Sequence, residues 1–107
     1  MIKIKNYIDG KLTTQKKDNF IDVYNPSIGK IYALCPNSTS YDLKNAISSA
    51  KRAFPAWSNL SYKNRSKFLF TIADILEKEL EEFSKSETLD NGKPITLSTN
   101  LDIPRAI

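Results

Sequence analysis

The spacing of the apolar residues changes near residue 40, and no other feature of this 107-residue sequence constrains the fold as strongly. Before residue 40, apolar and polar residues alternate in short runs, as in strands with one buried face, and turn-forming residues lie between these runs. After it, apolar residues recur at steps of three and four, which is the period of an amphipathic helix. The sequence therefore predicts strands first and helices afterwards.

Two turn signals divide residues 1–36 into two β-hairpins. The first is Asp9-Gly10, because both positions of such a two-residue turn favour positive φ. The second is the segment "NPSIG", in which Pro26 presets φ and Gly29 can adopt a left-handed conformation. Two successive hairpins predict a small antiparallel sheet.

The first apolar stripe predicts a helix over residues 40–55. Its members are Leu43, Ala46, Ile47, Ala50, Ala53 and Phe54. Ser40 is expected to cap the first turn, and Asp42 lies favourably near the positive end of the helix. Pro55 is expected to stop the helix, and Trp57 to cover its end as part of the core.

A second stripe predicts a long helix over residues 61–90. Its members are Leu69, Ile72, Ala73, Leu76, Leu80 and Phe83. Ser61 is the expected N-cap. Gly92 suits the left-handed residue just after a helix, and Pro94 prevents the helix from continuing.

The last residues predict the start of a further helix over 101–107, with Asp102 near its beginning and Pro104 in its first turn. A single turn of helix is unstable because helix nucleation is unfavourable. We therefore expect the sequence to be part of a longer chain. Without the rest of that chain, the long helix is expected to expose apolar surface, which favours association and loose packing.

The sequence contains no histidine and one cysteine, which excludes an internal disulfide, a Cys/His zinc site and a Ser-His-Asp triad within it. Cys35 is interpreted as a small buried residue, because no histidine is present to act as its base. No catalytic residue is assigned. No apolar run approaches the ~18 residues of a membrane span, and the first ten residues lack the apolar core of a signal peptide. These features predict a cytoplasmic protein without a membrane partner.

The charges are distributed unevenly along the chain. Residues 1–67 carry a net charge of +8 and residues 68–107 a net charge of −4. A basic first half leaves open one alternative, a small basic α+β module that binds nucleic acid. The lysines are dispersed and only three arginines occur, which favours a solvated surface and no nucleic-acid partner.

Several motifs occur in a fixed order along the chain: "NYIDGK", "YNPSIGKIYALCP", "AISSAKRAFPAWS", "NRSKFLFTIADILEKELEEF", "ETLDNGKP" and "DIPRAI". This series resembles the N-terminal portion of the aldehyde dehydrogenase superfamily over essentially the whole chain. Four segments are most similar to the 2-aminomuconic and 2-hydroxymuconic semialdehyde dehydrogenases: "CPNS", "AFPAWS", "LEEF" and "DIPRA".

The resemblance implies an α/β fold and an enzyme that oxidises an aldehyde to a carboxylic acid with NAD or NADP. In the family a cysteine thiolate attacks the aldehyde and a glutamate activates the water that releases the acid. These two residues and the cofactor-binding segment are expected beyond residue 107. The chain is thus expected to be inactive alone, to work with the remainder of the enzyme chain and to form a homo-oligomer. A catalytically inactive partner of full-length subunits is a further alternative.

The resemblance also implies roles for four residues. Asp90, with the main-chain carbonyls of Val23 and Tyr24, is expected to hold a structural monovalent cation; the alternative is an acid that bonds amides at the helix end. Arg105 is expected to bind the carboxylate of the substrate, because the guanidinium fork matches a planar carboxylate. The alternative for Arg105 is an ordinary surface residue.

Overall fold

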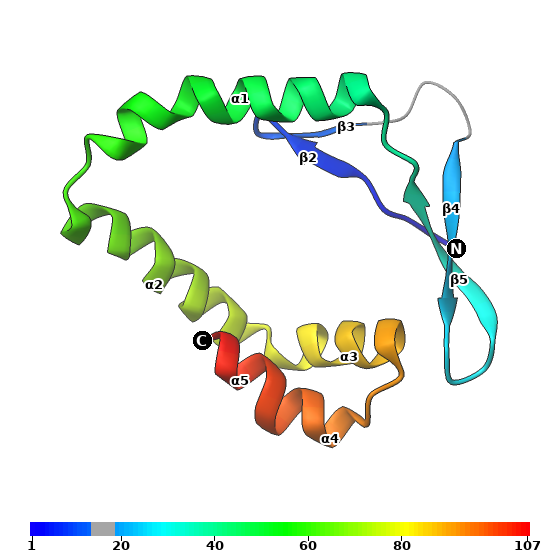
Figure 1. The fold of residues 1–107 in the computed structure, drawn as a ribbon. Helices are drawn as coiled ribbons and strands as arrows, with labels where there is room; N and C mark the ends of the chain where they lie inside the picture. The colour runs from blue at the N-terminus through cyan, green and yellow to red at the C-terminus, as the bar shows by residue number, and fades with distance from the viewer. Residues whose placement is uncertain (14–18) are drawn as a thin grey trace. The chain divides into compact units, whose positions relative to one another are not determined.

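The structure is a computed structural model that describes residues 1–13 and 19–107. It divides into two compact units, whose helices and strands are labelled in Figure 1. The first comprises Met1–Tyr24 and Ile31–Leu60, and the second comprises Asn25–Lys30 and Ser61–Ile107. The turn at residues 25–30 therefore belongs to the second unit, together with the later helices.

The predicted first hairpin is confirmed. Strands β2 (Asn6–Ile8) and β3 (Lys11–Thr13) pair antiparallel in the first unit, with Ile8 opposite Lys11. The two residues between the strands both have positive φ, 54° at Asp9 and 73° at Gly10. This is the backbone that a two-residue turn needs to match the twist of its strands.

The predicted single antiparallel sheet is wrong, because the strands form two sheets. Strand β5 (Lys30–Pro36) lies between β1 (Ile2–Lys3) and β4 (Phe20–Asn25), so the second predicted hairpin, β4–β5, is present. However, β1 pairs with β5 in parallel, in a sheet separate from β2–β3. An alternating pattern predicts a strand and its buried face, but it does not identify the strand's partner.

Helix α1 (Ser40–Ser58) starts where its capping residues predict, with one correction. The N-cap is Thr39 and not Ser40. The Asp42 amide donates to Thr39 Oγ1 at 3.3 Å, and the Thr39 amide donates to Asp42 Oδ2 at 2.8 Å. This reciprocal capping box satisfies two amides that the first turn of a helix leaves unpaired.

The predicted stop at Pro55 is also wrong, because α1 runs on to Ser58. A proline removes one amide donor from the helix but keeps its carbonyl. That carbonyl accepts bonds from Ser58 Oγ at 3.2 Å and from the Asn59 amide at 3.3 Å, which completes the last turn. Trp57 therefore lies on the helix, and it is 41% exposed and not a core residue.

The long helix predicted over residues 61–90 is two helices. Ser61 is the N-cap of α2 (Tyr62–Lys78), as predicted, and α3 (Leu80–Asn91) follows after Glu79, whose φ of −108° and ψ of 22° leave the helical region. Figure 1 shows the change of direction between the two helices. No glycine or proline marks the break. Leu76 and Leu80 keep the helical spacing across it and are both half-buried, so the apolar pattern cannot reveal it.

The helix predicted to begin at residue 101 begins earlier. The chain is already helical from Ile95, through α4 (Ile95–Leu97), the π-helical segment η1 (Ser98–Asp102) and α5 (Ile103–Ala106). Pro104 lies in the first turn of α5, as predicted. The start signals in the sequence thus mark the place where the α-helical pattern resumes after the π turn.

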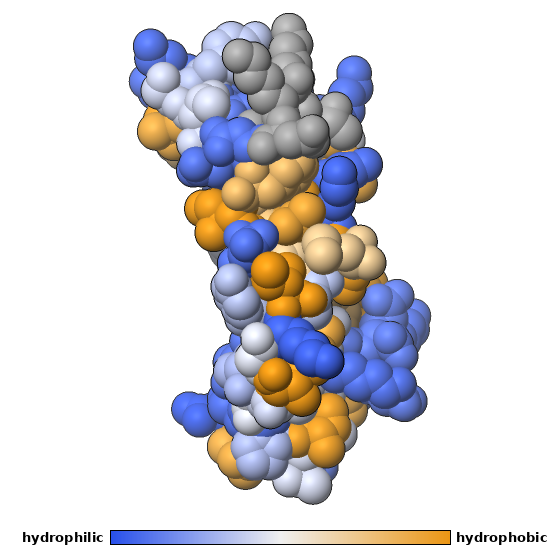
Figure 2. Space-filling model, turned by 90° about the vertical axis from the view of Figure 1, so that its right-hand side faces the viewer, coloured by the Kyte–Doolittle hydropathy of each residue, from blue (hydrophilic) through white to orange (hydrophobic). Residues whose placement is uncertain are grey.

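The fully buried side chains that the structure describes are small. They are Ala33 in β5, Ser84 in α3 and Ser98 in η1. Large apolar side chains reach the surface instead, and on α2 five of them are 47–70% exposed: Phe68, Leu69, Phe70, Ile72 and Ile75. Figure 2 shows hydrophobic patches that interrupt the hydrophilic surface on one face. The expected exposure of apolar helix surface is therefore present.

None of the helices in the described part of the chain combines the length and the apolar composition that crossing a bilayer requires.

Candidate functional site

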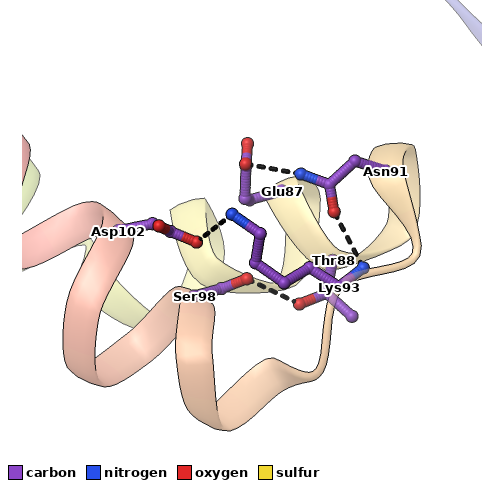
Figure 3. A network of polar contacts seen from close by, with 6 residues as sticks. All are labelled: Glu87, Thr88, Asn91, Lys93, Ser98 and Asp102. Carbon is purple, nitrogen blue, oxygen red and sulfur yellow. Dashed lines mark hydrogen bonds and ion pairs between the residues drawn. The ribbon is translucent and has the colours of Figure 1, made fainter.

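A network of polar contacts in the second unit lies where α3 ends and the chain turns back as α4, η1 and α5. We call this region the α3–α5 junction; its network residues are Glu87, Thr88, Asn91, Lys93, Ser98 and Asp102 (Figure 3). It contains the "ETLDNGKP" motif and the start of "DIPRAI". Helix α5 packs against both α2 and α3, which places its residues beside this network.

The Asn91 side chain fixes the loop after α3. Its Nδ2 atom donates to Glu87 Oε1 at 2.6 Å, and its Oδ1 atom accepts from the Lys93 amide at 2.8 Å. The second bond is the local turn that asparagine side chains form with the backbone two residues on. Asn91 therefore fixes the path of the chain from the end of α3 to Lys93 within the "ETLDNGKP" motif.

Gly92 of the "ETLDNGKP" motif packs directly against the "NPSIG" turn. Its φ of 75° confirms the predicted left-handed residue, and its amide donates to Thr88 O at 3.0 Å. A Cβ atom on Gly92 would lie 2.9 Å from Pro26 Cγ, closer than real Cβ contacts allow. Only glycine fits here, because both the backbone angle and the proline of the "NPSIG" turn exclude a side chain.

Two bonds tie the loop and α3 to the π-helical segment. Lys93 Nζ lies 2.5 Å from Asp102 Oδ2, with side chains 36% and 26% exposed. Thr88 Oγ1 lies 3.0 Å from Oγ of Ser98, which is fully buried. One ion pair therefore joins the loop to η1, and one hydroxyl contact joins α3 to η1; both are visible in Figure 3.

Arg105, the predicted substrate-binding residue, lies on α5 close to this ion pair in sequence. Its side chain is exposed, and no residue in the described part of the chain forms an ion pair with it. It follows Asp102 by three residues, and Asp102 is bound by Lys93.

The predicted cation ligands lie in both units. Asp90 is an exposed residue in the last turn of α3, whereas Val23 and Tyr24 lie on β4 of the first unit. Within residues 1–13 and 19–107, no three His, Cys, Asp or Glu side chains gather as a metal-binding group. The predicted cation ligands are one carboxylate and two main-chain carbonyls, which are not a group of this kind. The cation site therefore stays a prediction.

Cys35 is half-buried on β5 and therefore less covered than predicted, and its Sγ atom lies 4.0 Å from Pro36 O.

Asp9, in the turn between β2 and β3, contacts two side chains of α1. Asp9 Oδ1 accepts a hydrogen bond from Ser49 Oγ at 3.0 Å, and Oδ2 lies 3.2 Å from Arg52 Nη2. The Ser49 hydrogen bond and then the Arg52 charge lower the pKa of the Asp9 carboxyl. These contacts join the β2–β3 turn to α1.

Sequence reasoning missed Lys93 as a member of the site. Its partner is nine residues away, and the loop and π turn between them have no helical period that would relate the two positions. The usable signal was a lysine directly after the helix-ending glycine and an acid shortly before the DIPR arginine.

Comparison with known proteins identifies the family of this chain. The model of the "Aldehyde dehydrogenase family" matches residues 12–107. The chain belongs to the aldehyde dehydrogenase family. The family resemblance of the sequence motifs is thereby confirmed, and the two alternatives, a nucleic-acid-binding module and a catalytically inactive partner, gain no support from this match.

Relatives within the family include semialdehyde dehydrogenases. The 2-aminomuconic semialdehyde dehydrogenase of Homo sapiens is 40% identical over 107 residues, which are all of this chain and 22% of the relative. The malonate-semialdehyde dehydrogenase of Lacticaseibacillus casei is 39% identical over 92 residues, 86% of this chain and 19% of the relative. The chain thus spans about a fifth of the length of these relatives.

Solved structures confirm the α/β fold. PnpE in complex with nicotinamide adenine dinucleotide has a TM-score of 0.87 and 38% identity, covering 92% of this chain and 20% of that one. A putative aldehyde dehydrogenase from Burkholderia cenocepacia has a TM-score of 0.91 and 35% identity, covering 98% of this chain and 22% of that one.

Proposed function

We propose that residues 1–107 form the N-terminal part of an NAD(P)-dependent aldehyde dehydrogenase that oxidises a semialdehyde to the carboxylic acid. The observation that carries this proposal is the 40% identity to a 2-aminomuconic semialdehyde dehydrogenase over the whole chain. The similarity to a malonate-semialdehyde dehydrogenase supports the same substrate class. We take 2-aminomuconic or 2-hydroxymuconic semialdehyde as the first candidates.

In this proposal the chain supplies scaffold and substrate recognition, while the remainder of the enzyme supplies the chemistry. Cys35 lies half-buried in a strand and has no histidine to activate it. The three glycines lie in three separate turns, so the described residues do not fit NAD or NADP, whose phosphates need a glycine-rich strand-to-helix turn. We place cofactor binding in the rest of the chain.

Arg105 is the proposed contact for the substrate carboxylate. Its guanidinium is exposed and carries no ion pair within the described residues, so its donors are available to an anion. Two parallel N–H donors match the two oxygens of a carboxylate better than one ammonium group does. A semialdehyde acid presents that carboxylate together with the reacting aldehyde.

The proposal extends to a structural cation and to assembly. Asp90 with the carbonyls of Val23 and Tyr24 is the proposed ligand set for a monovalent cation, because carbonyl oxygens replace the hydration shell of alkali ions. The expected assembly is a homo-oligomer in the cytoplasm.

The test of the proposed function uses the full-length enzyme, in which residues 1–107 are followed by the remainder of the family's chain. Arg105→Ala should raise KM for a carboxylated semialdehyde by about tenfold or more, the value of one charged hydrogen bond, with kcat little changed. KM for an uncharged aldehyde of similar size is the control and should not change. Arg105→Lys should recover only part of the loss. An unchanged KM for the carboxylated substrate in Arg105→Ala would refute the role of Arg105.

A further inference from the structure

Asp102 and Arg105 are spaced to form an ion pair with each other, yet the structure pairs Asp102 with another residue. Both Asp102 and Ile103 have right-handed helical backbone angles, so Arg105 lies about one turn beyond Asp102. Helical side chains three residues apart are neighbours, with Cβ atoms about 5–6 Å apart, and Asp–Arg pairs at this spacing are attractive. Here, however, the Asp102 carboxylate binds Lys93 Nζ at 2.5 Å.

Lys93 is held in place for this contact by the loop that carries it. The Lys93 amide donates to Asn91 Oδ1, and the left-handed backbone of Gly92 turns the chain immediately before it. The ion pair is also more sheltered than a surface pair. The side chains of Lys93 and Asp102 are 36% and 26% exposed, whereas Lys85 and its partner Glu81 are 55% and 81% exposed. Water and salt screen the sheltered pair less.

We propose that Lys93 is a positioning residue that occupies the Asp102 carboxylate and so leaves the Arg105 guanidinium available for the substrate carboxylate. The inference rests on the proposed function, because it assumes that Arg105 recognises a carboxylated substrate. Without Lys93, Asp102 becomes a carboxylate one helical turn from Arg105. Such a tethered group competes at a high effective concentration with any anion that arrives from solution.

The test compares three variants of the full-length enzyme: Lys93→Met, Asp102→Asn and the double variant. Lys93→Met should raise KM for the carboxylated semialdehyde by about tenfold, the effect expected when one charged hydrogen bond to the substrate is lost to a competitor. Asp102→Asn alone should change KM little. The double variant should return to a KM close to that of Asp102→Asn, because the competing charge is gone. In all three, kcat and KM for an uncharged aldehyde should stay near the wild-type values.

A purely structural ion pair predicts a different pattern. All three variants would then break the same contact and would have similar defects, with no rescue in the double variant. That result overturns the inference. Lys85→Met is the matched control, since it removes exposed contacts to Glu81 and Glu82 and should leave KM unchanged. If Lys93→Met does not fold, Lys93→Gln with and without Asp102→Asn repeats the comparison.

The Arg105→Ala variant separates the two levels of the proposal. If KM is raised in Arg105→Ala but is not restored in the Lys93/Asp102 double variant, the role of Lys93 is refuted and the proposed function is still supported. An unchanged KM in Arg105→Ala refutes the role of Arg105 in binding the substrate and this inference with it.

Discussion

At the scale of single residues, Gly92 carries two separate constraints. Its φ of 75° disfavours any side chain, and the 2.9 Å approach of Pro26 Cγ leaves no room for a Cβ atom. The glycine therefore ends α3 and lets the turn at residues 25–30 pack against the loop. The two constraints can be measured separately, because Gly10 and Gly29 also have positive φ but have open space where a Cβ atom would lie.

Gly92→Ala should destabilise the full-length enzyme by more than the ~1–2 kcal/mol that a left-handed backbone alone costs an L-residue. The excess reports the clash with Pro26. Gly29→Ala is the matched control, since φ there is 64° and no atom lies within 4 Å of the added Cβ. The measurement is chemical denaturation of both variants. Equal losses for the two alanines would contradict the close packing of Pro26 on Gly92.

Asp90 tests the proposed cation. If Asp90 contributes a carboxylate ligand, the melting temperature of the full-length enzyme should be higher in sodium or potassium chloride than in choline chloride at equal ionic strength, because ions that bind only the folded state stabilise it. Asp90→Asn should abolish most of that difference. Asp74→Asn, a change of another acid on the preceding helix, should leave it intact. A difference that persists in Asp90→Asn would exclude Asp90 as a ligand.

At the scale of elements, the contact between the β2–β3 turn and α1 depends on the charge of Asp9. The Ser49 hydrogen bond and the Arg52 charge lower the pKa of Asp9 in the folded protein. A carboxyl whose pKa is lower in the folded state adds stability above its unfolded pKa and loses that contribution as the pH falls through its folded pKa.

Asp9→Asn should therefore lower the free energy of unfolding at neutral pH, and the difference from wild type should shrink as the pH falls below the ordinary pKa of an aspartate. Unfolding curves at several pH values measure this. Ser49→Ala should shift the loss to higher pH, because it removes the largest cause of the lowered pKa. A difference between Asp9→Asn and wild type that does not vary with pH would show that the charge is irrelevant.

Element ends and element partners differ in how far the sequence predicts them. The sequence predicts the Ser61 cap, the Gly92 helix end and the Asp9-Gly10 turn, because caps and tight turns are set by backbone preferences within a few residues. It does not predict the parallel pairing of β1 or the helix break at Glu79, because both depend on packing between segments distant in sequence. The candidate site shows the same difference. Resemblance to the family suggests Arg105, whereas the Lys93–Asp102 ion pair can be recognised only once the loop between α3 and η1 is folded.

At the scale of the whole molecule, the two units cover little of their own apolar surface. The fully buried side chains within the described residues are an alanine and two serines, while α2 exposes a run of aromatic and aliphatic groups. Apolar area of this kind stabilises a fold only when another surface covers it. We expect the remainder of the family's chain to provide that cover.

Aldehyde-dependent formation of NADH or NADPH shows whether residues 1–107 work as part of a larger aldehyde-oxidising enzyme. Residues 1–107 alone and the full-length enzyme are assayed side by side with the same semialdehyde. We predict product with the full-length enzyme and none with residues 1–107 alone. Activity of the isolated chain, or a well-folded full-length enzyme that oxidises no aldehyde, would refute the proposed function.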